Sequence, residues 1–162
     1  MISLHVRSVA DTHAVASALA QLARTGDVII LAGEMGAGKT AFAQGFADAL
    51  GVDEPVTSPT FTLVHTYDSG RVNLHHADLY RLDRMSEVAD LALAELVEGD
   101  GILLVEWGDV AASMLGDHLE LRLQHDDDDE NSRRIVVRGV GRGWVARWER
   151  VEAAVAPWRV EG

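Results

Sequence analysis

The chain of 162 residues contains no cysteine, which excludes disulfide bonds and thiolate metal sites. It also lacks any apolar stretch long enough to cross a bilayer. The first residues, Met1 to Arg7, show no basic segment followed by an apolar run, as a secretory leader would. We therefore expect a cytoplasmic protein without a membrane association.

Positive charge is scarce. The chain has 14 basic and 26 acidic residues, and its formal charge is −12. A net charge of that sign repels phosphate backbones, so binding of nucleic acid by this chain alone is not expected. Lys39 is the only lysine, and every other basic residue is arginine.

Length and composition predict one domain. A chain of 162 residues with 48% hydrophobic residues can bury one sizeable core but is short for two. We expect a single domain over residues 1–162, with a core over about 5–140 and a helical tail over about 141–162.

Apolar runs and capping residues predict a series of strands and helices that departs from simple alternation. The expected strands are 28–31, 61–67, 72–79, 102–105, 119–123 and 135–138. The expected helices run from Asp11 or Thr12 to about Arg24, from Lys39 to Leu50, from Ser86 to about Glu98, and from Trp144 to Val155. Fully apolar runs indicate parallel strands covered on both faces, and the short turn at residues 68–70 indicates a hairpin. The alternation at 119–123 and 135–138 indicates a second hairpin that closes one edge of the sheet. The fold class is therefore α/β, in three layers, with a mixed and mostly parallel sheet and helices on both faces.

A glycine-rich motif lies between the first of these strands and the helix that follows it. Gly33-Glu34-Met35-Gly36-Ala37-Gly38-Lys39-Thr40 matches the P-loop pattern G-x-x-x-x-G-K-[ST] at every fixed position. In such a loop, backbone N–H groups converge on phosphate oxygens. Lys39 is expected to reach the β- and γ-phosphates, and the Thr40 hydroxyl to bind Mg²⁺. The alternative, an ordinary glycine turn, does not require this pattern, so a P-loop NTPase fold is expected.

Two carboxylates follow other predicted strands. Glu106 comes directly after the apolar run 102–105, and Asp78 ends the strand 72–79. Mg²⁺ prefers hard oxygen ligands, so both are candidates for metal ligand or for the residue that orients the attacking water. The sequence leaves these two roles interchangeable. A surface glutamate after a strand is the alternative for Glu106.

Hydroxyl groups in the segment 57–60 offer another possible metal ligand. Thr60 or Thr57 could supply it, as nucleotide-sensing loops do. An ordinary turn at Pro59 fits the same residues.

The missing second lysine bears on the choice of nucleotide. Guanine-specific P-loop proteins typically read the base with an N-K-x-D element, and this chain has no lysine for one. We therefore expect ATP or ADP to bind in preference to GTP.

Two further segments have ordinary explanations. The acidic run 126–130 lacks the glycine and the alternating ligands of a calcium loop, so a solvated turn is expected. The tail after about Gly141 could form an amphipathic docking helix or a helix that packs on the domain.

Several segments together resemble one family. These are the P-loop, Thr57-Ser58-Pro59-Thr60-Phe61-Thr62, His76-Ala77-Asp78-Leu79-Tyr80-Arg81-Leu82 and Val105-Glu106-Trp107-Gly108. The set is similar to the TsaE (YjeE) family, over about residues 5 to 140. That family comprises bacterial P-loop ATPases needed for threonylcarbamoyladenosine in tRNA, which work with TsaD and TsaB.

The resemblance implies roles for particular residues. Lys39 and Thr40 would bind nucleotide and Mg²⁺, and Glu106 and Asp78 would belong to the metal and hydrolysis site. Trp107 would lie beside the nucleotide, although a core tryptophan would look the same, and Thr57 to Phe61 would form a switch-like loop. The resemblance further implies a weak ATPase controlled by TsaD and TsaB, with tRNA held mainly by those partners.

Two other functions fit a P-loop. A small-molecule kinase would transfer phosphate to a defined acceptor, but no arginine-rich lid occurs between Glu87 and Gly101. A nucleotide-gated binding module would use ATP only to stabilise one docking conformation.

Overall fold

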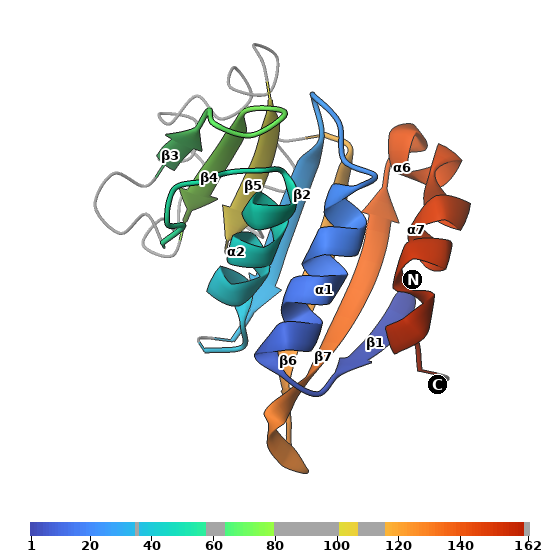
Figure 1. The fold of residues 1–162 in the computed structure, drawn as a ribbon. Coiled ribbons are helices and arrows are strands. Elements are labelled where there is room, and N and C mark those ends of the chain that lie inside the picture. The colour runs from blue at the N-terminus through green and yellow to red at the C-terminus, as the bar shows by residue number, and fades with distance from the viewer. Residues whose placement is uncertain (35, 58–63, 80–100, 107–115, 161–162) are drawn as a thin grey trace.

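The computed structural model describes residues 1–34, 36–57, 64–79, 101–106 and 116–160. A seven-stranded sheet runs in the order β1-β7-β6-β2-β5-β4-β3 (Figure 1). Its strands are β1 Ile2–Val6, β2 Val28–Gly33, β3 Val64–Tyr67, β4 Leu74–Asp78, β5 Ile102–Glu106, β6 His118–Asp126 and β7 Asp129–Val140. The helices are α1 Val9–Ala20, α2 Lys39–Ala49, α6 Arg142–Ala146, α7 Trp148–Val155 and the short 3-10 helix η2 Ala156–Trp158.

The sheet is mixed, as predicted. Its centre is parallel, because β2 pairs in parallel with both β5 and β6, and β4 pairs in parallel with β5. The flanking pairs β3–β4, β6–β7 and β1–β7 are antiparallel. The carboxyl ends of β2, β4 and β5 therefore meet at one edge of the sheet, where ligands bind in open α/β folds.

The edge strand β1 was not among the expected elements. Ile2, Leu4 and Val6 are buried and alternate with partly exposed residues, which is the period-2 pattern of a strand with one covered face. The signal was present in the sequence but is only five residues long.

Helix α1 begins earlier than expected. Its N-cap is Ser8, whose Oγ accepts a hydrogen bond from the backbone N–H of Asp11 at 3.1 Å. The Asp11 carboxylate in turn accepts one from the backbone N–H of Arg7 at 3.0 Å. These two hydrogen bonds satisfy backbone N–H groups at the start of the helix. The expected cap at Asp11 or Thr12 was therefore wrong. The helix also ends at Ala20 rather than near Arg24.

Helices α1 and α2 lie side by side on one face of the sheet (Figure 1). Their close approach depends on Gly45, where a Cβ atom would lie 2.7 Å from the Cα of His13. Phe42 and Phe46 of α2 are fully buried against the sheet, with ring centroids 6.2 Å apart. The central strand β2 is buried on both faces over residues 28–32, as the apolar run predicted.

The C-terminal tail packs on the same domain. Val151 and Val155 of α7 are fully buried, and α7 contacts α1. Arg147, between α6 and α7, forms a bidentate ion pair with Asp27 at 2.6 and 2.9 Å. Of the two expectations for the tail, packing is confirmed, and the single expected helix is divided into two helices at Arg147.

The two hairpins can be compared with the structure, whereas one expected helix cannot. The β3–β4 hairpin and the β6–β7 hairpin are present, and the acidic run forms the exposed turn of the latter. The β6–β7 hairpin does not close the sheet edge as expected, because β1 pairs with β7 and forms that edge. The helix expected from Ser86 to about Glu98 lies outside the described residues. Within the described part of the chain, every helix is too short or too polar to span a membrane.

Candidate functional site

The glycine loop leaves β2 at Gly33 and enters α2 at Lys39. Gly33, Gly36 and Gly38 have φ values of 136°, 78° and 107°, a region that residues with a Cβ atom rarely adopt. Gly33 also has no room for a side chain, because a Cβ atom would clash with the backbone oxygen of Leu123 on β6. The motif glycines are thus required by backbone conformation and by strand packing.

The N-terminus of α2 faces into the loop without a side-chain cap. Its N-cap residue is Gly38, which has no side chain to accept a hydrogen bond from the first N–H groups of the helix. Such N–H groups, at the positive end of a helix, favour an anion. The loop and helix therefore form a phosphate-binding structure of the kind that the motif predicted.

Lys39 is held over the loop and is only 5% exposed. Its Nζ donates to the backbone oxygens of Gly33 and Glu34, each at 2.8 Å. Desolvation by burial lowers the pKa of Lys39, while the negative charges of Glu106 and Asp78 act in the opposite direction. The ammonium group is therefore positioned by the backbone and lies within the field of both predicted carboxylates.

The two carboxylates end adjacent strands. Asp78 and Glu106 are direct partners in the parallel β4–β5 register, and Leu31 of β2 is the partner of Glu106 on the other side. Glu106 is 3% exposed and Asp78 is half-buried. The structure thus brings together Lys39, Asp78 and Glu106 at the edge where β2 passes into the glycine loop.

Sequence reasoning missed one polar contact at this site. Nε2 of His76 lies 2.6 Å from Oε2 of Glu106, and the His76 side chain is fully buried. The adjacent His75 and His76 lack the ligand spacing of a zinc site, and the sequence assigns His76 no other role. An available signal was its spacing two residues before Asp78 in a strand, which puts both side chains on one face.

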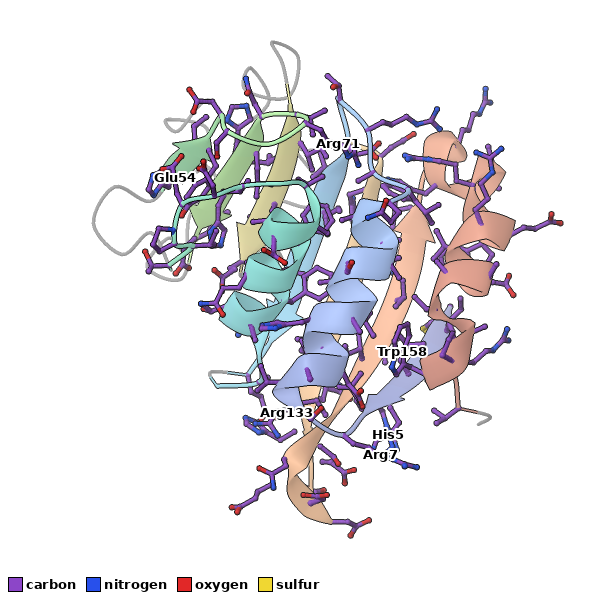
Figure 2. All side chains as sticks on the ribbon, in the orientation of Figure 1. His5, Arg7, Glu54, Arg71, Arg133 and Trp158 are labelled. Atoms are coloured by element: carbon purple, nitrogen blue, oxygen red, sulfur yellow. The ribbon has the colours of Figure 1, made fainter. Side chains whose placement is uncertain are left out.

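The β6–β7 hairpin extends past the other side of the loop. Nη2 of Arg133 on β7 lies 3.5 Å from the backbone oxygen of Gly36, and Nε2 of His125 on β6 lies 4.0 Å from a carboxylate oxygen of Glu34. Figure 2 shows Arg133 at the end of the sheet from which the loop leaves β2. Sequence reasoning did not single out either residue, because their distance from the loop in the chain hides the contact.

The other predicted site residues lie partly within and partly outside the described residues. Met35, Thr60 and Trp107 lie outside the described residues, whereas Thr57 is described and exposed. Thr40 is the second residue of α2 and is half-buried. The site described is therefore made of the loop, the start of α2 and the ends of β4 and β5.

The donor set fits Mg²⁺ bound together with a nucleotide rather than a resident protein metal site. Among the described residues, no group of three or more His, Asp or Glu side chains could hold a metal ion. Mg²⁺ usually takes one or two carboxylates and completes its shell with phosphate oxygens and water. Thr40, Asp78 and Glu106 carry oxygen atoms of that kind, close to the glycine loop.

Comparison with known proteins gives a consistent picture. The family model described as "Threonylcarbamoyl adenosine biosynthesis protein TsaE" matches residues 6–135. A tRNA threonylcarbamoyladenosine biosynthesis protein TsaE from Bacillus subtilis is 42% identical over 132 residues, which are 81% of this chain and 81% of that protein. The protein of the same name from Treponema pallidum is 39% identical over 127 residues, covering 76% of this chain and 93% of its own length.

The fold is shared as well. The crystal structure of YdiB from Bacillus subtilis superposes with a TM-score of 0.79 at 31% sequence identity, covering 94% of this chain and 97% of that one. Because the family model spans most of the chain, and relatives near 40% identity match over most of their own length, the chain belongs to the TsaE family of tRNA threonylcarbamoyladenosine biosynthesis proteins.

Proposed function

We propose that the chain binds Mg-ATP on the glycine loop and hydrolyses it slowly, as a step in tRNA threonylcarbamoyladenosine modification. The main support is the position of Lys39, which two loop carbonyl groups hold beside the carboxylates of Asp78 and Glu106. Phosphoryl transfer requires positioning and charge stabilisation more than covalent catalysis by the protein. This arrangement supplies both.

The nucleotide would lie with its phosphates against the loop. Backbone N–H groups at the start of α2 would bind phosphate oxygens, and the Lys39 ammonium would bind the β- and γ-phosphates. The terminal phosphate would then lie near the ends of β4 and β5, where the two carboxylates are.

The Thr40 hydroxyl and the two carboxylates would hold the metal ion and order the attacking water. When bound, the metal ion would supply positive charge against the negative charge that develops on the phosphate oxygens. Glu106 is buried, so its carboxylate has a defined direction, whereas the half-buried Asp78 is more accessible from the site. We propose that both carboxylates are essential for hydrolysis and that Lys39 stabilises the transferred charge.

The family places the chain with tRNA modification, and we propose that it acts there through TsaD and TsaB. A formal charge of −12 disfavours direct binding to tRNA. The partner proteins would therefore hold the tRNA, and ATP turnover on this chain would rearrange the complex in the cytoplasm.

The deciding experiment is Mg-dependent ATP hydrolysis by the full chain, alone and with its TsaD and TsaB counterparts. Glu106→Ala should lose turnover but still bind ATP, and Glu149→Ala, which removes an exposed glutamate from α7, should behave as wild type. Hydrolysis should be slow and should change when the partners are added. A rate that is the same in wild type and Glu106→Ala would refute the proposal, and faster transfer to a small acceptor than to water would indicate a kinase.

A further inference from the structure

The buried imidazole of His76 is the feature that the fold alone does not explain. Its side chain is fully buried in β4, and its register partner on β5 is Leu104, which in turn pairs with Ile29 on β2. Leu104 and Ile29 belong to the apolar core on the face that α2 covers. An apolar side chain would suit this layer better than an imidazole.

Only one of its two ring nitrogens has a partner among the described residues. Nε2 lies 2.6 Å from Oε2 of Glu106, whereas Nδ1 is buried without a hydrogen bond to any described group. Nearly all buried polar groups in proteins are paired, so an unpaired one needs a specific reason. The observed pairing favours the tautomer in which Nε2 carries the proton and donates it to the carboxylate.

Sheet geometry makes this contact directional. Asp78 is the direct register partner of Glu106, and His76, two residues earlier in β4, lies on the same face in the layer beneath. Diagonal neighbours on a sheet are within reach of long side chains. His76 therefore contacts Glu106 from the core side, while the glycine loop and Lys39 lie at the edge of the sheet.

We propose that His76 is a positioning residue for Glu106. The Nε2–H of His76 donates to one carboxylate oxygen of Glu106 and so directs the other oxygen toward the nucleotide site. A glutamate side chain has three rotatable bonds, and one buried donor restricts them. Supporting hydrogen bonds of this type change metal affinity or activity by about 10- to 100-fold when they are removed. The proposal rests on the proposed function, since it assigns His76 a role in the same hydrolytic site.

Two substitutions separate this role from simple packing. In His76→Gln the side-chain amide nitrogen can reach the Nε2 position, whereas in His76→Asn it reaches only the Nδ1 position. Both variants place an amide in the same core layer, so their melting temperatures should fall together. We expect kcat to fall about 10- to 100-fold in His76→Asn and to stay within about 3-fold of wild type in His76→Gln. KM for Mg-ATP should rise several-fold in His76→Asn and stay near the wild-type value in His76→Gln.

Binding supplies a readout besides turnover. Affinity for a fluorescent ATP analogue should gain several-fold less from Mg²⁺ in His76→Asn than in wild type, with the Mg-free affinity unchanged. His75→Asn is the matched control, because it alters a buried imidazole in the same strand on the opposite face, where His75 contacts Thr66. His75→Asn should leave kcat and the Mg²⁺-dependent gain in affinity unchanged.

The Glu106→Ala background completes the test, because His76 should act only through Glu106. Because Glu106→Ala retains ATP binding but not turnover, the readout here is the gain in ATP-analogue affinity that Mg²⁺ produces. Adding His76→Asn to Glu106→Ala should lower that gain by less than about 2-fold. Equal losses in His76→Gln and His76→Asn, or an undiminished further loss in the Glu106→Ala background, would overturn the proposal. If wild type and Glu106→Ala turn over ATP equally, the hydrolytic function itself fails, and that result is distinct from the other two.

Discussion

Replacing the Arg147 guanidinium should destabilise the whole domain, although Arg147 is far from the glycine loop in the chain. Arg147 and Asp27 are each 7% exposed and form two hydrogen bonds at 2.6 and 2.9 Å. Arg147 also donates to the backbone oxygen of Leu22 at 3.1 Å, and its guanidinium lies 3.8 Å from the ring centroid of Trp144. The residue therefore connects the tail to the turn that precedes β2.

The magnitude follows from what remains after the substitution. Arg147→Met keeps most of the apolar stem but leaves the Asp27 carboxylate buried without its cation. Removing one partner of a buried ion pair costs about 3–5 kcal/mol. Asp27 keeps a hydrogen bond from the backbone N–H of Arg24 at 2.9 Å, so we expect the lower end, about 3 kcal/mol.

Chemical and thermal unfolding followed by circular dichroism would measure this change. For a chain of this length the melting temperature should fall by roughly 6–12 °C. Arg150→Ala, an exposed arginine on α7, is the matched control and should change stability by less than about 0.5 kcal/mol. A loss below about 1 kcal/mol in Arg147→Met, or additive losses in an Asp27–Arg147 double-mutant cycle, would refute the argument.

Three further outcomes are expected. Gly33→Ala should cost more than about 3 kcal/mol, because its Cβ would meet a backbone oxygen of β6, whereas Gly26→Ala, in open space at a φ of 94°, should cost about 1 kcal/mol in denaturant titrations. Lys39→Ala should stay folded and weaken ATP binding by roughly 10- to 100-fold in fluorescence titrations, because charge-assisted bonds to phosphate are lost. The backbone N–H of Asp128 holds the pKa of Asp126 below its ordinary 3.8. The ionised Asp126 carboxylate therefore contributes stability above pH 3.8, and this contribution is lost as the pH falls through the folded-state pKa. A carboxyl NMR titration would show the lowered pKa.

The nucleotide loop was predictable because its determinants are local. The glycines with positive φ, Gly36 and Gly38, directly follow an apolar strand and directly precede a helix. Each of these features can be recognised from neighbouring residues. The sequence also assigned Asp78 and Glu106 to one site, but their direct pairing is a matter of β4–β5 register, which it did not specify.

The ends of helices were predicted less well than the loop, because contacts outside the helix decide where it begins and ends. Asp11 and Thr12 are good capping residues, but Ser8 forms the cap, because Asp11 is used to bind the backbone N–H of Arg7 instead. The tail had one helical pattern, yet it divides at Arg147, where the side chain turns inward to Asp27.

The sequence by itself determined the phosphate-binding loop, its single lysine and the strands that carry the two carboxylates, because backbone conformation and apolar periodicity are short-range properties. Only the tertiary structure decided which distant side chains meet there. His76 and Glu106 are 30 residues apart, and Arg147 and Asp27 are 120 apart. Their contacts depend on strand register and helix packing, which the whole core sets jointly and which no local pattern specifies.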